Sequence, residues 1–153
     1  MLLLYAARLN PRGILCQIET VTMDDNTGQV LIVDDEMDIC YLLSVILKQR
    51  NLPSKFVNTL SEAQFAMKRE LPSILFLDNH LPDGLGVDFI REVKTNYPLV
   101  KVILITAYDS SVEKQAALQE GADFFIGKPF SKATINETVD RIMNLSYYAK
   151  PSV

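Results

Sequence analysis

Five side chains able to bind a metal ion or a phosphate each follow a short apolar run in this sequence. They are the carboxylates, hydroxyl and ammonium of Asp34, Asp35, Asp78, Thr106 and Lys128. Carboxylate oxygens with room for water suit Mg2+ or Mn2+, and crowded carboxylates need such a cation to stay ionised. A carboxylate beside that metal could attack phosphorus and form an acyl phosphate. The ammonium and the hydroxyl would then share the charge that develops on the phosphoryl oxygens.

The apolar runs that precede these residues predict the strands of a parallel sheet. Four of them, at 30–33, 74–77, 100–105 and 124–126, read as buried strands, and 55–57 reads as a shorter one. Segments with apolar residues at helical spacing alternate with these runs. The alternation predicts an α/β fold: a three-layer, doubly wound, parallel five-stranded sheet. Because parallel strands end at one edge, we expect the five side chains to converge there.

Hydroxyl residues mark the expected starts of several helices. Ser61 with Gln64 and Ser110 with Glu113 have the spacing of a capping box. Ser131 is expected to cap the last helix. The second helix is expected to turn Ala63, Phe65, Ala66 and Met67 toward the core. The inner face of the last helix is predicted to consist of Ile135, Val139, Ile142 and Met143.

Composition limits the class of protein. The 153 residues suffice for one domain that buries roughly 70% of its unfolded surface. A net charge of -4 leaves no basic field, so we expect no nucleic acid to bind this segment. Only Cys16 and Cys40 are present, which argues against a disulfide framework and favours a reducing, cytoplasmic location. No apolar run is long enough to span a membrane.

The ends of the chain do not join this pattern. Residues 1–28 mix a short apolar patch with polar residues, and Met23 stands within them like a second start codon. We interpret them as a leader, either disordered or an artefact of an upstream start site, with a docking segment as the alternative. Residues 147–153 are interpreted as a tail or the start of a linker.

The segment from about Gln29 to Leu145 resembles the receiver domain of two-component response regulators. The resemblance rests on the acidic pair after the first strand, a central Asp-x-x-Leu-Pro-x-x-x-Gly motif, a Thr-Ala pair and a Lys-Pro pair. In this sequence they begin at Asp34, Asp78, Thr106 and Lys128. The resemblance implies a flavodoxin-like sheet with strand order 2-1-3-4-5, and a receiver domain over residues 29–146.

The resemblance also implies roles for these residues. Asp78 would accept a phosphoryl group from a phosphohistidine of a sensor histidine kinase or a phosphotransfer protein. Asp35, Asp78 and the backbone carbonyl of His80 would bind Mg2+, or Mn2+, and Asp34 would act through water. Lys128 would bind a phosphoryl oxygen.

The same resemblance implies a switch that controls a partner or a C-terminal output domain missing from this chain. Thr106 and Phe125 would be its moving residues, although Phe125 departs from the frequent tyrosine. The residues expected to tune the lifetime of the phosphorylated state are His80, Tyr108 and Ala107. A homodimer and a stand-alone regulator both remain open.

Simpler interpretations compete with this one. The run Asp34-Asp35-Glu36 taken alone would be an acidic helix N-terminus, stabilised by the helix dipole. An aspartate-nucleophile phosphatase on the same scaffold is the alternative function, with the acyl phosphate as an intermediate. That enzyme would need a general acid near its nucleophile and a cap over its substrate. The sequence has neither an Asp-x-Asp pair at Asp78 nor an inserted cap, so we expect a switch without turnover of an external substrate.

Overall fold

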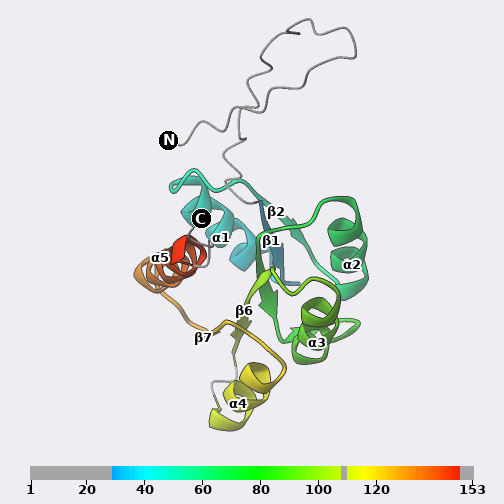
Figure 1. The fold of residues 1–153 in the computed structure, drawn as a ribbon. Helices are drawn as coiled ribbons and strands as arrows, with labels where there is room; N and C mark the ends of the chain where they lie inside the picture. Colours follow the sequence, from blue (N-terminus) through cyan, green and yellow to red (C-terminus); the bar gives the residue numbers. More distant parts are fainter. Residues whose placement is uncertain (1–28, 108–109, 149–153) are drawn as a thin grey trace, which may run out of the picture.

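The structure is a computed structural model that describes residues 29–107 and 110–148 (Figure 1). Its main sheet has five parallel strands in the order β2-β1-β3-β6-β7. In chain order, the strands are β1 (Val30–Val33), β2 (Ser54–Val57), β3 (Ile74–Asp78), β6 (Lys101–Thr106) and β7 (Phe124–Gly127). Counted along the chain within this sheet, that order is the predicted 2-1-3-4-5. The doubly wound α/β fold is therefore confirmed.

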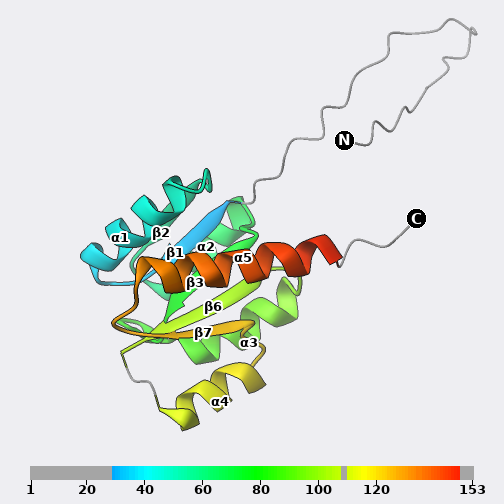
Figure 2. The ribbon, with the colours of Figure 1, turned by 90° about the vertical axis from the view of Figure 1, so that its left-hand side faces the viewer.

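Helices cover both faces of the sheet. They are α1 (Met37–Lys48), α2 (Leu60–Arg69), α3 (Gly86–Asn96), α4 (Ser111–Gln119) and α5 (Lys132–Tyr148). Figures 1 and 2 show α1 and α5 on one face and α2 and α3 on the other, with α4 beside α3. The chain thus forms three layers, and the carboxyl ends of all five strands lie at one edge.

Each strand supplies apolar side chains to two separate cores, because successive residues point to opposite faces. In β3, Ile74 and Phe76 pack with α1 and α5, whereas Leu75 and Leu77 pack with α2 and α3. All five residues of β3 are buried. Each such side chain contributes about 1.5–3 kcal/mol to stability through burial. The strand that ends in Asp78 is thereby among the most firmly held parts of the fold.

A short hairpin that the sequence did not reveal connects β3 to α3. Its strands are β4 (His80–Leu81) and β5 (Gly84–Leu85), which pair antiparallel. Asp83 at its turn accepts hydrogen bonds from the backbone N–H groups of Leu60 (2.8 Å) and Ser61 (2.9 Å). These bonds lower the pKa of the exposed Asp83 carboxyl. The hairpin after the central strand is thus anchored to the start of α2.

The helix caps and faces were predicted with mixed success. Ser110 caps α4 through a bond from Glu113 N (3.1 Å), as expected. The expected cap at Ser61 was wrong, because Thr59 caps α2 and the Ser61 hydroxyl donates to Asp83 instead. Two inner-face residues were also wrong: Phe65 is 63% exposed and Met143 is 47% exposed.

Geometry explains the two misplaced side chains. In α2, the buried pair is Ala63 and Met67, four residues apart, and Phe65 lies between them on the opposite side. In α5, Ile135, Val139 and Ile142 form the buried stripe, and Met143 projects about 100° away from Ile142.

Several expectations fall outside the described residues: the leader at 1–28, Tyr108, and the tail from 149 onward. The part of residues 147–153 that is described, Tyr147 and Tyr148, forms the end of α5. Within the described ranges, none of the helices has the length and apolar character needed to cross a membrane.

Candidate functional site

The structure brings Asp34, Asp78 and Lys128 together at the carboxyl edge of the sheet. Asp34 follows β1, Asp78 ends β3 and Lys128 follows β7. The Lys128 ammonium nitrogen lies 3.0 Å from an oxygen of Asp34 and 2.9 Å from an oxygen of Asp78. A third carboxylate, from Glu36, lies 2.7 Å from the same nitrogen. One ammonium therefore joins carboxylates from widely separated parts of the chain.

Asp34 is buried, and hydrogen bonds hold both its side chain and its backbone. Its Oδ1 accepts a hydrogen bond from the backbone N–H of Glu36 (2.9 Å). Its own carbonyl oxygen accepts from the side chains of Asn58 (2.8 Å) and Cys40 (3.3 Å). Burial raises the pKa of the Asp34 carboxyl, although the Glu36 N–H and Lys128 oppose that rise. The charge of Asp34 is thus costly to keep, and a cation beside it would stabilise it.

Asp78 is buried and its carboxylate is aimed by two donors. Oδ1 accepts from Lys128, and Oδ2 accepts from the backbone N–H of His80 (2.7 Å). Behind it, Gly86 begins α3 so close to the strand that an added Cβ would overlap the carbonyl oxygen of Asp78. Glycine at position 86 therefore allows α3 to start directly against the residue expected to react.

Asn79 fixes the same loop from the buried side. Its Oδ1 accepts from the backbone N–H of Val87 (3.0 Å), and its carbonyl oxygen accepts from the backbone N–H of Gly86 (2.8 Å). Its own N–H donates to the carbonyl of Ile105 in β6 (3.1 Å). Asn79 thus links the end of β3 to β6 and to the start of α3, directly beside Asp78.

The Lys128 side chain is only 11% exposed, and it nevertheless stays protonated. Burial lowers the pKa of the ammonium, but hydrogen bonds to Glu36, Asp78 and Asp34 more than offset this, so the pKa lies above its ordinary value. Its backbone N–H donates to the carbonyl of Thr106 (2.7 Å), which ties the loop after β7 to the end of β6. Lys128 is therefore a fixed positive charge beside Asp78.

The remaining predicted residues surround this cluster at different depths. Thr106 is fully buried at the end of β6, opposite Gly127 in the sheet register. Ala107 and His80 are exposed. Phe125 is half-buried and packs against the core on the α2 and α3 side. The structure thus places Thr106 at the same edge as Asp78 and leaves Phe125 partly accessible within β7.

Asp35 is exposed in the turn that carries Asp34. Across residues 29–107 and 110–148, no three carboxylate, imidazole or thiol side chains form a ready metal-binding group. The expected Mg2+ set is of another kind, because it uses the carboxylates of Asp35 and Asp78 with a backbone carbonyl. The charges fit a divalent cation: Asp34, Asp35, Glu36 and Asp78 supply four carboxylates, against the single ammonium of Lys128.

Three residues have roles at this edge that the sequence did not predict: Glu36, Asn79 and Gly86. Glu36 occupies the N-cap position of α1, and its side chain makes no capping hydrogen bond there. One feature of the sequence indicates that the Glu36 side chain has a role other than capping: glutamate is not among the residues preferred at an N-cap. Nothing local distinguishes Asn79 from an ordinary turn residue, since its partners lie on other elements.

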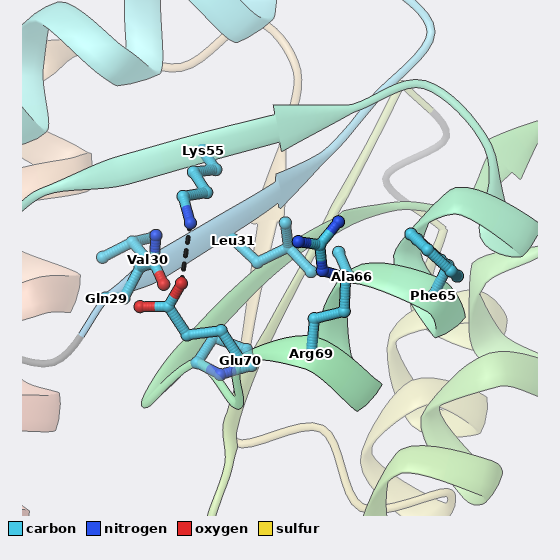
Figure 3. A pocket seen from close by; sticks show the side chains of 9 residues that line it. Gln29, Val30, Leu31, Lys55, Phe65, Ala66, Arg69 and Glu70 are labelled. Atoms are coloured by element: carbon cyan, nitrogen blue, oxygen red, sulfur yellow. Dashed lines mark hydrogen bonds and ion pairs between the residues drawn. The ribbon is translucent and has the colours of Figure 1, made fainter.

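A separate hollow lies at the opposite, amino end of the strands. It has a volume of about 390 Å³ and is lined by the starts of β1 and β2 and the end of α2. Figure 3 shows the ion pair between Lys55 and Glu70 (2.7 Å) on its wall, with Arg69 and Phe65 nearby. None of the residues expected to react lines this hollow. The two ends of the sheet therefore differ in chemistry.

Comparison with known sequences decides the family. Residues 30–140 match the response regulator receiver domain family. The chain belongs to this family. It is 34% identical to the response regulator protein PilR of Pseudomonas aeruginosa over 117 residues, which are 76% of this chain and 26% of PilR. It is 32% identical over 127 residues to the alkaline phosphatase synthesis transcriptional regulatory protein PhoP of Bacillus subtilis, covering 81% of this chain and 52% of PhoP.

Solved receiver structures have the same fold. The beryllofluoride-activated NtrC4 receiver domain dimer is 36% identical to this chain and has a TM-score of 0.73. The match covers 76% of this chain and 96% of that one. The receiver domain thus spans a quarter to a half of the curated relatives named above, and nearly all of the NtrC4 receiver.

Proposed function

We propose that this receiver domain is a switch driven by phosphorylation of Asp78. The Asp78 carboxylate would attack the phosphorus of a phosphohistidine on a sensor histidine kinase or a phosphotransfer protein. A P–O bond forms, the P–N bond breaks, and the histidine nitrogen leaves with the bonding electron pair. The observation that supports this most strongly is the buried Asp78 carboxylate held 2.9 Å from the Lys128 ammonium.

We further propose that Mg2+, or Mn2+, binds beside Asp78. Asp35, Asp78 and the backbone carbonyl of His80 would hold it, with Asp34 acting through water. The support is the excess of carboxylates over cations at this edge and the burial that makes the charge of Asp34 costly. A divalent cation here would neutralise charge on the carboxylates and on the incoming phosphoryl oxygens.

The conformational response is assigned to residues next to the reacting carboxylate. Thr106 would move toward the phosphoryl group and Phe125 would turn inward, while His80, Ala107 and Tyr108 would set the lifetime of the acyl phosphate. The switch would act in the cytoplasm on a partner or an output domain. The match covers only 26% of PilR and 52% of PhoP, so these relatives have further sequence outside the receiver. We infer that an output domain of this kind is one target of the switch. The dimer of the NtrC4 receiver supports self-association as another.

The test is labelling with acetyl phosphate in Mg2+, comparing wild type, Asp78→Asn and Asp88→Asn. Asp88 is an exposed aspartate in the first turn of α3, so its variant controls for the loss of one charge. Wild type and Asp88→Asn should each take up one phosphoryl group per chain, and Asp78→Asn should take up none. Labelling of Asp78→Asn at the wild-type rate would reject the assignment.

A turnover assay on the same proteins separates a switch from a phosphatase. A switch should consume acetyl phosphate only as fast as its own acyl phosphate hydrolyses, and should not act on other phosphate esters. Sustained hydrolysis of a small phosphate ester such as p-nitrophenyl phosphate, lost in Asp78→Asn, would instead indicate an enzyme.

A further inference from the structure

The contacts of Lys128 create a problem for phosphoryl binding. A lysine ammonium has three N–H donors and no acceptor. In this structure the ammonium donates hydrogen bonds to Glu36 (2.7 Å) and Asp78 (2.9 Å) and forms an ion pair with Asp34 (3.0 Å). A phosphoryl oxygen that binds Lys128 must therefore compete with these three carboxylates.

Burial identifies which carboxylate can leave most easily. The side chains of Asp34 and Asp78 are 2% and 6% exposed, whereas that of Glu36 is 60% exposed. A released Asp34 would keep a buried charge without its cation, which is unfavourable. Asp78 is the phosphoryl acceptor and stays at the site, so the comparison is between Asp34 and Glu36. Water can solvate the Glu36 carboxylate as soon as it leaves, so its release costs less than that of Asp34.

The local backbone does not restrain the Glu36 side chain. Glu36 is the N-cap residue of α1, and its side chain makes no capping bond. The turn is held instead by the bond from the Glu36 backbone N–H to Asp34 Oδ1 (2.9 Å). The carboxylate of Glu36 can therefore swing between Lys128 and solvent while the turn and α1 stay in place.

We propose that Glu36 is a displaceable counter-ion of Lys128. In the unphosphorylated protein it occupies the ammonium donor that later binds a phosphoryl oxygen, and it yields that donor when the phosphoryl group arrives. Glu36 is thus a positioning residue that acts through Lys128. This inference rests on the proposed function of Asp78 and deepens it.

Beryllofluoride with saturating Mg2+ tests the proposal, because it probes binding of a phosphoryl-like group without hydrolysis. Glu36→Gln should bind beryllofluoride about two- to five-fold more tightly than wild type, as expected for loss of one competing ion pair at the surface. Glu36→Asp keeps the charge but is one methylene shorter, so it should bind more tightly than wild type as well. Asp38→Asn, an exposed acidic residue in the first turn of α1, is the charge control and should change affinity by less than about two-fold. Affinity can be followed by NMR or by fluorescence of a coupled probe.

Two results would overturn the proposal. One is a Glu36→Gln protein that binds beryllofluoride no more tightly than wild type. The other is a Glu36→Asp protein that behaves like wild type while Glu36→Gln and Asp38→Asn gain equally, since charge alone would then explain the gain. If wild type binds no beryllofluoride and Asp78 takes no label from acetyl phosphate, the proposed function fails together with this inference. Binding by wild type with no gain in Glu36→Gln leaves the proposed function intact.

Discussion

An ionic cluster of lysine and carboxylate side chains lies at each end of strand β7, and the two clusters have central groups of opposite charge. Before the strand, Asp123 accepts bonds from Lys94 (2.6 Å), Lys101 (3.4 Å) and the backbone N–H of Val102 (2.8 Å). After the strand, Lys128 faces three carboxylates. One cluster surrounds a carboxylate with donors, and the other surrounds an ammonium with acceptors.

This difference separates a structural role from a reactive one. The Asp123 carboxylate accepts bonds from three donors. Lys94 of α3 also donates to the carbonyl of Val100 (2.7 Å), which links α3 to the residue before β6. At the Lys128 end the carboxylates outnumber the cation, and one of them is exposed to solvent. Unbalanced negative charge in a partly buried site attracts a further cation. The amino end is thus expected to hold the fold, and the carboxyl end to bind ligands.

Among the variants that test this contrast, Lys128→Ala is expected to change the free energy of unfolding most. The variant leaves Asp34 and Asp78 buried without their cation, so we expect a loss of about 3 kcal/mol in the free energy of unfolding. Mg2+ binding should persist and should restore part of that loss. The loss should also shrink as the pH falls, because burial already raises the pKa of Asp34 and its protonation removes one of the unpaired charges.

Urea unfolding with and without Mg2+ measures the effect of Lys128→Ala. Lys132→Ala removes an exposed lysine at the start of α5 and should change stability by no more than about 0.5 kcal/mol. A Lys128→Ala protein as stable as this control, with or without Mg2+, would contradict the assigned charge balance.

A smaller effect, on stability alone, is expected at the other end of the strand. Asp123→Ala removes the acceptor of three donors, so unfolding should become easier by about 1–3 kcal/mol. Asp123→Asn should lose less, because an amide oxygen can still accept from Val102. Labelling of Asp78 by acetyl phosphate should proceed at the wild-type rate in both variants at a temperature where they are folded. A clear labelling defect in either folded variant would contradict the distinction between the two ends.

The smallest expected effect concerns the hairpin that joins β3 to α3. The pKa of Asp83 is lowered from 3.8 by bonds from Leu60 and Ser61, so its ionised form stabilises the folded state. That contribution is present above the unfolded pKa and is lost as the pH falls through the folded pKa. Asp83→Asn should therefore be less stable than wild type at neutral pH, and the difference should narrow in acid. Urea unfolding over a pH series measures it, and a difference independent of pH would refute this account of Asp83.

The strands and the edge that they form could be read from the sequence with good accuracy. Apolar runs located all five strands of the main sheet, and parallel topology placed Asp34, Asp78, Thr106 and Lys128 at one edge. The position of β6 between β3 and β7 was supplied by the family resemblance, because strand order is not encoded in local periodicity. The interpretation of Asp34 and Asp35 likewise required Asp78 and Lys128 elsewhere in the chain.

Side-chain partners between distant elements could not be predicted. Thr59 and Ser61 are both plausible caps, and the choice depends on Asp83, which lies 22 residues beyond Ser61. Glu36 reaches Lys128, 92 residues away, only because β1 and β7 end at the same edge. Phe65 and Met143 were misplaced because one residue of offset on a helix moves a side chain by about 100°. Such details follow from tertiary packing and not from local pattern.

The most direct test of the account is a titration of the ¹⁵N-labelled wild-type protein with Mg2+ and then beryllofluoride, followed by NMR. The backbone amides after β1, β3, β6 and β7, including those of His80 and Lys128, should shift at both steps. The amides around Asp123 and Lys94 should shift far less. Shifts concentrated at the amino end of the strands, or none at the carboxyl end, would contradict the claim that this edge binds a divalent cation and a phosphoryl group.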